Sequence, residues 1–310
     1  MSCYRLLLKP YQWTFEQPLQ THHGLWKVRE GLIIGLERQD GVTGWGEVAP
    51  IPWFGTETLE AAIAFCKSLP DPLTESEILS VSDSLPACQF GFGSAWESLS
   101  MPPFTTDYKP CQISALLPAG EAALSAWPAL WAKGHRTFKW KIGILEVPQE
   151  LELFQNLTAA LPQDGTLRLD ANGGLTLEQA QQWLENCDRI SHICIEYLEQ
   201  PLPPNQFEAM KQLAQAHKTP LALDESVATV AQLKQCHERG WRGVMVVKVA
   251  IAGYPQALRD FLNTHEVKVV FSSAFETEVG RRAALALAQE FNASDRAIGF
   301  GVKPRVTSLG

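Results

Sequence analysis

From about Cys111 onward, short apolar runs alternate with amphipathic stretches along the chain. Eight runs rich in branched and aromatic residues predict strands at 111–117, 136–142, 165–170, 193–199, 219–225, 243–249, 267–273 and 296–301. Apolar residues recur at helical spacing between most of them, which predicts helices at 147–161, 176–187, 205–217, 229–240, 254–265 and 277–291. Thr176 and Gln179 have the form of a capping box that opens one of these helices.

Alternating strands and helices are typical of an α/β fold. A unit of about 25 residues matches a barrel of parallel strands surrounded by helices. The competing architecture is a doubly wound open sheet. No GxGxxG or Walker loop follows any of the strand runs, so no nucleotide site supports the open sheet. We therefore expect a β/α barrel over residues 105–310.

The first hundred residues are irregular and rich in turns. Two strands are predicted at 32–37 and 43–48, joined by a turn at Asp40 and Gly41. Helical spacing predicts helices at 57–69 and 91–100. The stretch "MPPF" at 101–104 has the composition of a linker. We expect residues 1–104 to form a separate, small α+β domain.

Composition narrows the class of protein. The 310 residues are 45% hydrophobic and 19% charged, which is typical of a folded protein with more than one domain. A net charge of −8 disfavours a nucleic-acid partner. No apolar run approaches the roughly 20 residues that cross a membrane. The apolar run near the N-terminus is too short for a secretory signal. Seven cysteines without a CxxC pair fit a reducing cytoplasm.

Charged and polar side chains lie near the ends of successive strand runs, where barrel enzymes carry their chemistry. The second run carries "KWK", so both lysines point to one face of the strand and the tryptophan between them to the other. In chain order the set is Lys139 and Lys141, Asp170, Glu199, Asp224 and Glu225, Lys248, then Ser272 and Ser273.

Three carboxylates that converge repel one another unless a cation lies between them, and ligands made only of oxygen suit Mg²⁺, with Mn²⁺ as a second choice. A lysine beside such a cation has a lowered pKa and can act as a general base. Simpler explanations exist for each residue: Asp170 as a turn residue, Lys248 as an ion-pair partner of Asp224. They would have to hold independently on five consecutive runs.

The motifs occur in a known order. "KWK" (139–141), "LDAN" (169–172), "EQP" (199–201), "LDES" (223–226) and "VVKVAIAGY" (246–254) resemble the enolase superfamily in its muconate-lactonizing subgroup. "REGLII" (29–34) and "GWGEVAPIPWFGTET" (44–58) resemble the capping domain of that family. The resemblance covers nearly the whole chain. It implies a (β/α)7β TIM-like barrel with an N-terminal α+β capping domain, to which the C-terminal tail contributes.

The resemblance also implies residue roles. Lys141 would be the acid/base and Lys248 the second catalytic lysine. The metal ligands would be Asp170, Glu199 and Asp224.

Neighbouring residues would support these groups. Lys139 would be a supporting cation that contacts the substrate carboxylate, Asn172 would orient a metal ligand and Glu225 would pair with a nearby lysine. The family often has an aromatic residue where this chain has Leu175, a departure that concerns packing more than chemistry.

The seventh strand run helps to choose among members of the subgroup. By this resemblance, the dipeptide epimerases of the subgroup have a DxD motif at this strand, whereas "VVFSSAFETEVG" has no aspartate. Ser272 and Ser273 are therefore expected to donate to a substrate carboxylate. "REGL" and the compact length resemble the o-succinylbenzoate synthases, which dehydrate 2-succinyl-6-hydroxy-2,4-cyclohexadiene-1-carboxylate in menaquinone or phylloquinone synthesis. The partner would be a small carboxylate.

Alternatives remain open at this stage. Within the subgroup they are an N-acylamino-acid racemase, a dipeptide epimerase or a muconate cycloisomerase. Outside it they are a non-catalytic barrel and a Schiff-base aldolase. Oligomeric state is not readable from the sequence. Thr21, His22, His23 and Gly24, with Phe54 and Gly55, resemble loops that close over the substrate. Arg29 would contact the substrate or pair cap with barrel, and we favour the pairing.

Overall fold

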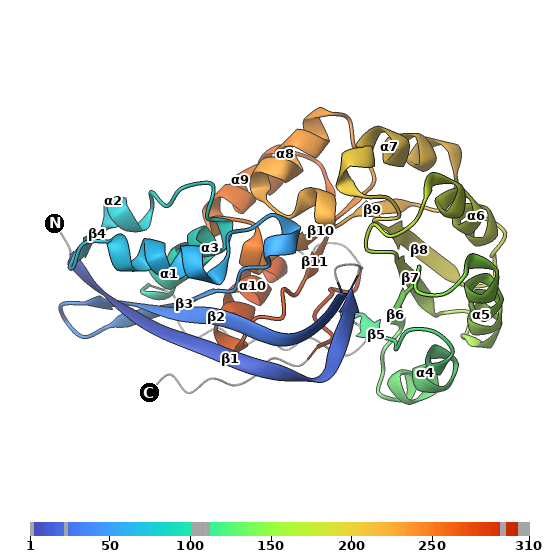
Figure 1. Ribbon diagram of the computed structural model, residues 1–310, viewed down its shortest axis with the longest axis horizontal. Coiled ribbons are helices and arrows are strands. Elements are labelled where there is room, and N and C mark those ends of the chain that lie inside the picture. Colours follow the sequence, from blue (N-terminus) through green and yellow to red (C-terminus); the bar gives the residue numbers. More distant parts are fainter. Residues whose placement is uncertain (1–2, 22–23, 101–108, 110–111, 292–295, 303–310) are drawn as a thin grey trace.

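The N-terminal domain is built on a four-stranded antiparallel sheet, seen at the left of the computed structural model in Figure 1. The structure describes residues 3–21, 24–100, 109, 112–291 and 296–302. The sheet has the order β3-β2-β1-β4, with β1 at Cys3–Thr21, β2 at Gly24–Arg38, β3 at Thr43–Val48 and β4 at Leu73–Thr74. Its helices are η1 (Pro52–Phe54), α1 (Leu59–Ser68), α2 (Glu75–Ile78) and α3 (Pro86–Ser98).

The strands predicted at 32–37 and 43–48 lie within β2 and β3, and Gly41 makes the turn with a positive φ of 85°. The prediction of an irregular N-terminus is wrong, because β1 runs for 19 residues beside β2. Among the described side chains of β1, only Tyr4 and Phe15 are buried, so its hydrophobic alternation is weak, and Pro10 interrupts it.

The helix predicted at 91–100 begins earlier, at Pro86, and lies flat on the sheet. Its glycines permit that contact: a Cβ on Gly91 would stand 2.6 Å from Val48, and one on Gly46 would stand 2.0 Å from the Gly91 carbonyl oxygen. The "GFG" of this segment is therefore a packing device, which gives the weak likeness to a glycine loop a structural explanation.

Seven parallel strands of the second domain are hydrogen-bonded in sequence order. They are β5 (Ala115–Leu116), β6 (Thr137–Lys141), β7 (Thr166–Asp170), β8 (Cys194–Glu199), β9 (Leu221–Leu223), β10 (Val244–Lys248) and β11 (Lys268–Ser272). Bridges from Ile298 to Ile113 and from Gly299 to Ser272 join the two edges of the sheet. The sheet is thus closed, the barrel prediction is confirmed, and the open-sheet alternative is excluded.

Helices surround this barrel (Figure 1): α4 (Ala122–Ala132), α5 (Val147–Ala160), α6 (Leu177–Cys187), α7 (Phe207–Ala216), α8 (Val230–Glu238), α9 (Pro255–Thr264) and α10 (Glu278–Phe291). The pattern did not predict α4, which contains Pro128, a residue that normally argues against a helix interior. Over the described ranges, no helix combines the length and the apolar character needed to cross a membrane. The predicted linker at 101–104 and the C-terminal tail beyond residue 302 lie outside the described residues.

A buried carboxylate joins the two domains. Glu47 of β3 is fully buried and accepts hydrogen bonds from the backbone N–H groups of Thr277 (2.8 Å) and Gly280 (2.9 Å) at the start of α10. The Tyr11 hydroxyl of β1 donates to the same carboxylate at 2.6 Å. A negative charge at a helix N-terminus is favourable, so the N-terminal domain, here called the cap, supplies a carboxylate that stabilises a helix of the barrel.

Replacing Glu47 by alanine is expected to lower the free energy of unfolding by about 2–3 kcal/mol, because buried N–H groups of α10 lose their acceptor. Urea unfolding followed by circular dichroism measures the change. The control is Glu37→Ala on β2, whose ion pair with Arg5 spans 3.5 Å at the surface and should contribute less than about 1 kcal/mol. Equal effects of the two substitutions would contradict the importance of this domain contact.

Candidate active site

The parallel register brings the predicted residues to one rim of the barrel. Lys141 stands opposite Asp170, and Asp170 stands opposite Glu199, each at the last paired position of its strand. Asp224 follows β9, and Lys248 ends β10. Trp140 points the other way and packs against Trp183 of α6, so the predicted division of the two faces is confirmed.

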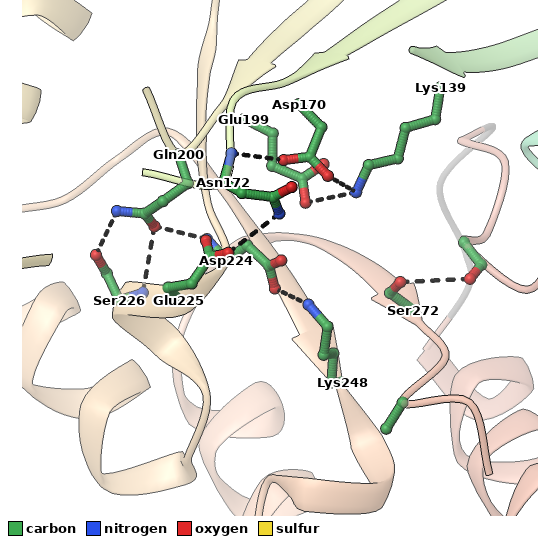
Figure 2. A network of polar contacts seen from close by, with 12 residues as sticks. Lys139, Asp170, Asn172, Glu199, Gln200, Asp224, Glu225, Ser226, Lys248 and Ser272 are labelled. Atoms are coloured by element: carbon green, nitrogen blue, oxygen red, sulfur yellow. Dashed lines mark hydrogen bonds and ion pairs between the residues drawn. The ribbon is translucent and has the colours of Figure 1, made fainter. Parts of the chain in front are cut away.

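Lys139 bridges two of the acids, as Figure 2 shows. Its Nζ lies 2.7 Å from Asp170 Oδ2 and 2.8 Å from Glu199 Oε1. Both carboxylates are almost completely buried, where an unpaired charge is costly. The lysine expected to contact the substrate therefore neutralises the acids in this structure.

On the other side of the site, Lys248 forms a buried ion pair with Asp224. The loop that carries Asp224 is held by the side-chain oxygen of Gln200, which accepts from the backbone N–H groups of Asp224 (3.0 Å) and Ser226 (3.2 Å). Gln200 itself adopts a left-handed backbone conformation, with φ of 38°. Such a conformation is rare outside glycine and persists where surrounding contacts enforce it.

Asn172 supports the site in the predicted position. Its backbone N–H donates to Asp170 Oδ1 at 3.0 Å, and its side-chain amide donates to Glu225 Oε1 at 3.2 Å. Glu225 was predicted to pair with a lysine, but the hydrogen bond that the structure gives its side chain comes from Asn172. The reason is the left-handed turn at Asn172, with φ of 46°, which carries the amide across to the next loop.

Burial and mutual repulsion shift the pKa values of these groups. Burial, followed by the charge of Asp170, raises the pKa of Glu199 to about 8. Burial, followed by Asp224, raises the pKa of Glu225 to about 8. Burial lowers the pKa of Lys141, and the neighbouring charge of Lys139 lowers it further. The rim thus combines crowded carboxylates with one lysine whose pKa is lowered from its ordinary value.

The donor set fits a divalent cation. Among the described residues, Glu199 Oε2 is buried without a hydrogen-bond partner, and it faces a site rich in carboxylate oxygens. Within the same residues, no three acidic, histidine or cysteine side chains already form a cluster with metal-ligand spacing. Lys139 and Lys248 lie among the acids instead. Hard oxygen donors of this kind suit Mg²⁺ or Mn²⁺.

The two serines predicted to donate to a substrate carboxylate, Ser272 at the end of β11 and Ser273 after it, form hydrogen bonds within the protein in this structure. The hydroxyl of Ser273 donates to the buried Glu276 at 2.9 Å, and its backbone N–H donates to Gly299. Ser272 donates to the Gly299 carbonyl oxygen at 3.3 Å. Both serines line the cavity, but these donors are engaged within the protein. Glu276 was not among the predicted site residues, and it accepts the hydrogen bond from the Ser273 hydroxyl.

A cavity of about 560 Å³ lies between the rim and the cap. Its lining combines the lysines and acids of the rim with apolar residues of the cap, namely Pro18, Trp26, Ile51, Trp53 and Phe54. Trp26, Phe15 and Phe275 pack edge to face above the site, with ring centroids 5.1–5.5 Å apart. The cavity therefore suits a small anion with an apolar body.

Arg29 makes neither of its two predicted contacts and instead holds segments of the cap together. Its guanidinium is buried and donates to the carbonyl oxygens of Ala49 (2.5 Å), Pro50 (2.8 Å) and Glu30 (2.9 Å). These contacts all lie within the cap, so the favoured pairing of cap with barrel is wrong. His22 and His23 lie outside the described residues, and nothing is described of the side chain of Thr21.

Comparison with known proteins gives two family matches. The family described as Enolase C-terminal domain-like matches residues 123–303, and the family described as MenC, N-terminal domain, matches residues 5–99. The o-succinylbenzoate synthase of Thermosynechococcus vestitus is 42% identical over 294 residues, which cover 94% of this chain and 90% of that protein. The o-succinylbenzoate synthase of Yersinia pestis is 27% identical over 87% of this chain and 81% of its own length.

Solved structures agree with these matches. The o-succinylbenzoate synthase of Thermosynechococcus elongatus, complexed with Mg in the active site, has a TM-score of 0.91 and 40% identity, covering 98% of this chain and 97% of that one. A dipeptide epimerase of Enterococcus faecalis, complexed with Mg and a dipeptide, has a TM-score of 0.81 at 18% identity, covering 100% of this chain and 95% of that one. The second likeness concerns the fold alone.

Stability should depend on pH through Glu276. Burial raises the pKa of this carboxyl, so the folded protein holds its proton more tightly than the unfolded chain does. The free energy of unfolding should therefore decrease as pH rises from about 4.3, the ordinary glutamate pKa, through the raised pKa. Glu276→Gln removes the titration and should flatten this part of the pH profile, measured by urea unfolding.

The control for Glu276→Gln is Glu60→Gln on α1, an exposed position. This variant loses the same formal charge and should keep the wild-type pH profile. A Glu276→Gln profile as steep as that of the wild type would contradict the assignment.

Proposed function

Since this chain belongs to the o-succinylbenzoate synthase family of the enolase superfamily, we propose that it dehydrates 2-succinyl-6-hydroxy-2,4-cyclohexadiene-1-carboxylate to o-succinylbenzoate. The observation that carries the proposal is the ordered set of acids and lysines at one rim, which lines a cavity together with apolar residues of the cap. The reaction would serve menaquinone or phylloquinone synthesis in the cytoplasm. Its partner would be this small-molecule carboxylate.

Asp170, Glu199 and Asp224 would hold Mg²⁺. When bound, the ion supplies a Lewis acid that stabilises negative charge on the substrate carboxylate. These acids come from three adjacent strand ends, and Asn172 and Gln200 fix two of them through backbone contacts. Lys139 would keep the pair Asp170 and Glu199 from repelling each other.

Lys141 would move the proton. Its lowered pKa makes the ammonium easier to deprotonate than in water, and the neutral amine can accept the proton from the carbon bearing the substrate carboxylate. The same ammonium would then return the proton to the departing hydroxyl on that face. One C–H and one C–O bond break, a ring double bond forms, and water leaves. Aromatisation supplies much of the driving force.

Lys248 would remain a cation. It lies on β10, across the barrel rim from Lys141 on β6, and its ion pair with Asp224 keeps a positive charge beside the acids. That charge would stabilise the negative charge that develops on the substrate when Lys141 removes the proton. Ser272, at the end of β11, would line the substrate site without being its main donor.

The two lysines also favour a second candidate activity. A base on each of two facing strands can exchange an α-proton from either side, which is what a racemase needs. An N-acylamino-acid racemase activity would appear as deuterium incorporation at the α-carbon of N-succinyl amino acids in D₂O. Incorporation without any dehydration would replace the synthase proposal by this one.

Purified protein with Mg²⁺ is expected to convert the cyclohexadiene substrate to o-succinylbenzoate, followed by absorbance and mass spectrometry. Lys141→Ala should lower kcat by about 10²–10⁴-fold, because the proton loses its acceptor. Lys133→Ala at the exposed end of α4 is the matched control and should keep wild-type activity. Full activity in Lys141→Ala would exclude Lys141 as the base.

Mg²⁺ affinity should depend on the three acids. Asp170→Asn, Glu199→Gln and Asp224→Asn are each expected to weaken Mg²⁺ binding in titration calorimetry by at least about 10–100-fold, since each loses an anionic ligand. Asp164→Asn, an exposed aspartate whose side chain is 72% accessible, should bind Mg²⁺ like the wild type. Unchanged affinity in all three variants would place the metal elsewhere.

A further inference from the structure

A phenylalanine of the cap lies against a lysine of the barrel. The Nζ atom of Lys248 stands 4.1 Å from the centroid of the Phe54 ring, within the range of a cation–π contact. The same ammonium is paired with Asp224. Lys248 is only 8% exposed, so both contacts act on a charge largely shielded from water.

The backbone around Phe54 is fixed by local hydrogen bonds. Phe54 ends the short helix η1, where its N–H donates to Ile51 at 2.8 Å and the N–H of Gly55 donates to Pro52 at 2.9 Å. The turn closes through Thr56, whose hydroxyl accepts from Ile51 at 2.8 Å. Gly55 has a φ of 86°, which a side chain would disfavour. The ring is therefore presented by a defined turn.

The rest of the cap holds this turn in place. Arg29 binds the carbonyl oxygens of Ala49 and Pro50, directly before the turn. Within the turn, Trp53 packs edge to face on Trp26 of β2, with ring centroids 4.8 Å apart. Arg29 and Trp26, which make these contacts, both lie on β2 of the cap sheet. The position of Phe54 over Lys248 is thus set by the domain that covers the site.

We propose that Phe54 is a positioning residue for Lys248, supplied by the cap to direct the ammonium of a barrel lysine; this role rests on the proposed function. A lysine ammonium has three N–H donors. Asp224 takes one and the face of the Phe54 ring attracts another, which leaves the third for the cavity. Without the ring, the flexible lysine would lose one of its two fixed contacts.

The contact also restricts how a substrate ring meets Lys248. Phe54 covers one side of the ammonium, so a cation–π contact with the substrate has to come from another side. Residues of η1 thereby select the orientation of the substrate ring, although Phe54 takes no part in bond making.

Fluorinated phenylalanines at position 54 test this role, because each fluorine weakens the negative ring face while changing its size little. The synthase kcat is expected to fall stepwise, by about tenfold from phenylalanine to trifluorophenylalanine, with KM nearly unchanged. Phe54→Leu should lose about as much, and Phe54→Tyr should retain activity. Thermal unfolding checks that every variant is folded.

The matched control is the same fluorine series at Phe65. This residue is also half-buried in the cap, but it packs edge to face on Phe92. Its series should leave kcat unchanged. A flat series at position 54 in an active enzyme would overturn the positioning role alone. An inactive wild-type enzyme would overturn the proposed function and the positioning role with it.

Discussion

Charge balance at the barrel rim is the constraint on which the site depends. Asp170, Glu199 and Asp224 are almost fully buried, and three such carboxylates could not remain ionised together in an apolar interior. Lys139 lies between two of them and Lys248 pairs with the third. Burial, followed by the charge of Asp170, still raises the pKa of Glu199, so its ionised form is disfavoured in this site. The residual demand for positive charge is the physical basis of a metal site.

Strand register turns that constraint into geometry. Because Lys141, Asp170 and Glu199 are aligned across three parallel strands, their side chains lie side by side at one end of the barrel. The residues that precede them in β6 and β7, Trp140 and Leu169, are fully buried in the apolar core. A slip of one residue would exchange these two sets of side chains, so packing of the core fixes the placement of the charges.

Most of the barrel and its charged rim could be predicted from the sequence, because the charged residues lie at the ends of strongly apolar strand runs. What escaped prediction depends on which side chains and segments contact one another in the folded chain. The alternation of β1 is weak, and among its described side chains only Tyr4 and Phe15 are buried. Ser273 looked like a free donor, and only the structure shows that Glu276, three residues later, folds back onto it. Glu47 lies 230 residues before Thr277, and no local pattern indicates that the two meet.

Two contacts join the domains near the site, one made by Glu47 and one by Phe54. The barrel supplies the acids and lysines, and a dipeptide epimerase with only 18% identity retains the same fold. A fold shared so widely cannot by itself determine the substrate. The cap is better placed to do so, since Glu47 anchors it to α10 while Phe54 reaches Lys248. The Glu47 contacts join the cap to α10, and the Phe54 ring lies against Lys248, the lysine proposed to stabilise charge on the substrate. Selectivity in this protein is therefore expected to reside in the cap turn that carries Phe54, which lines the cavity.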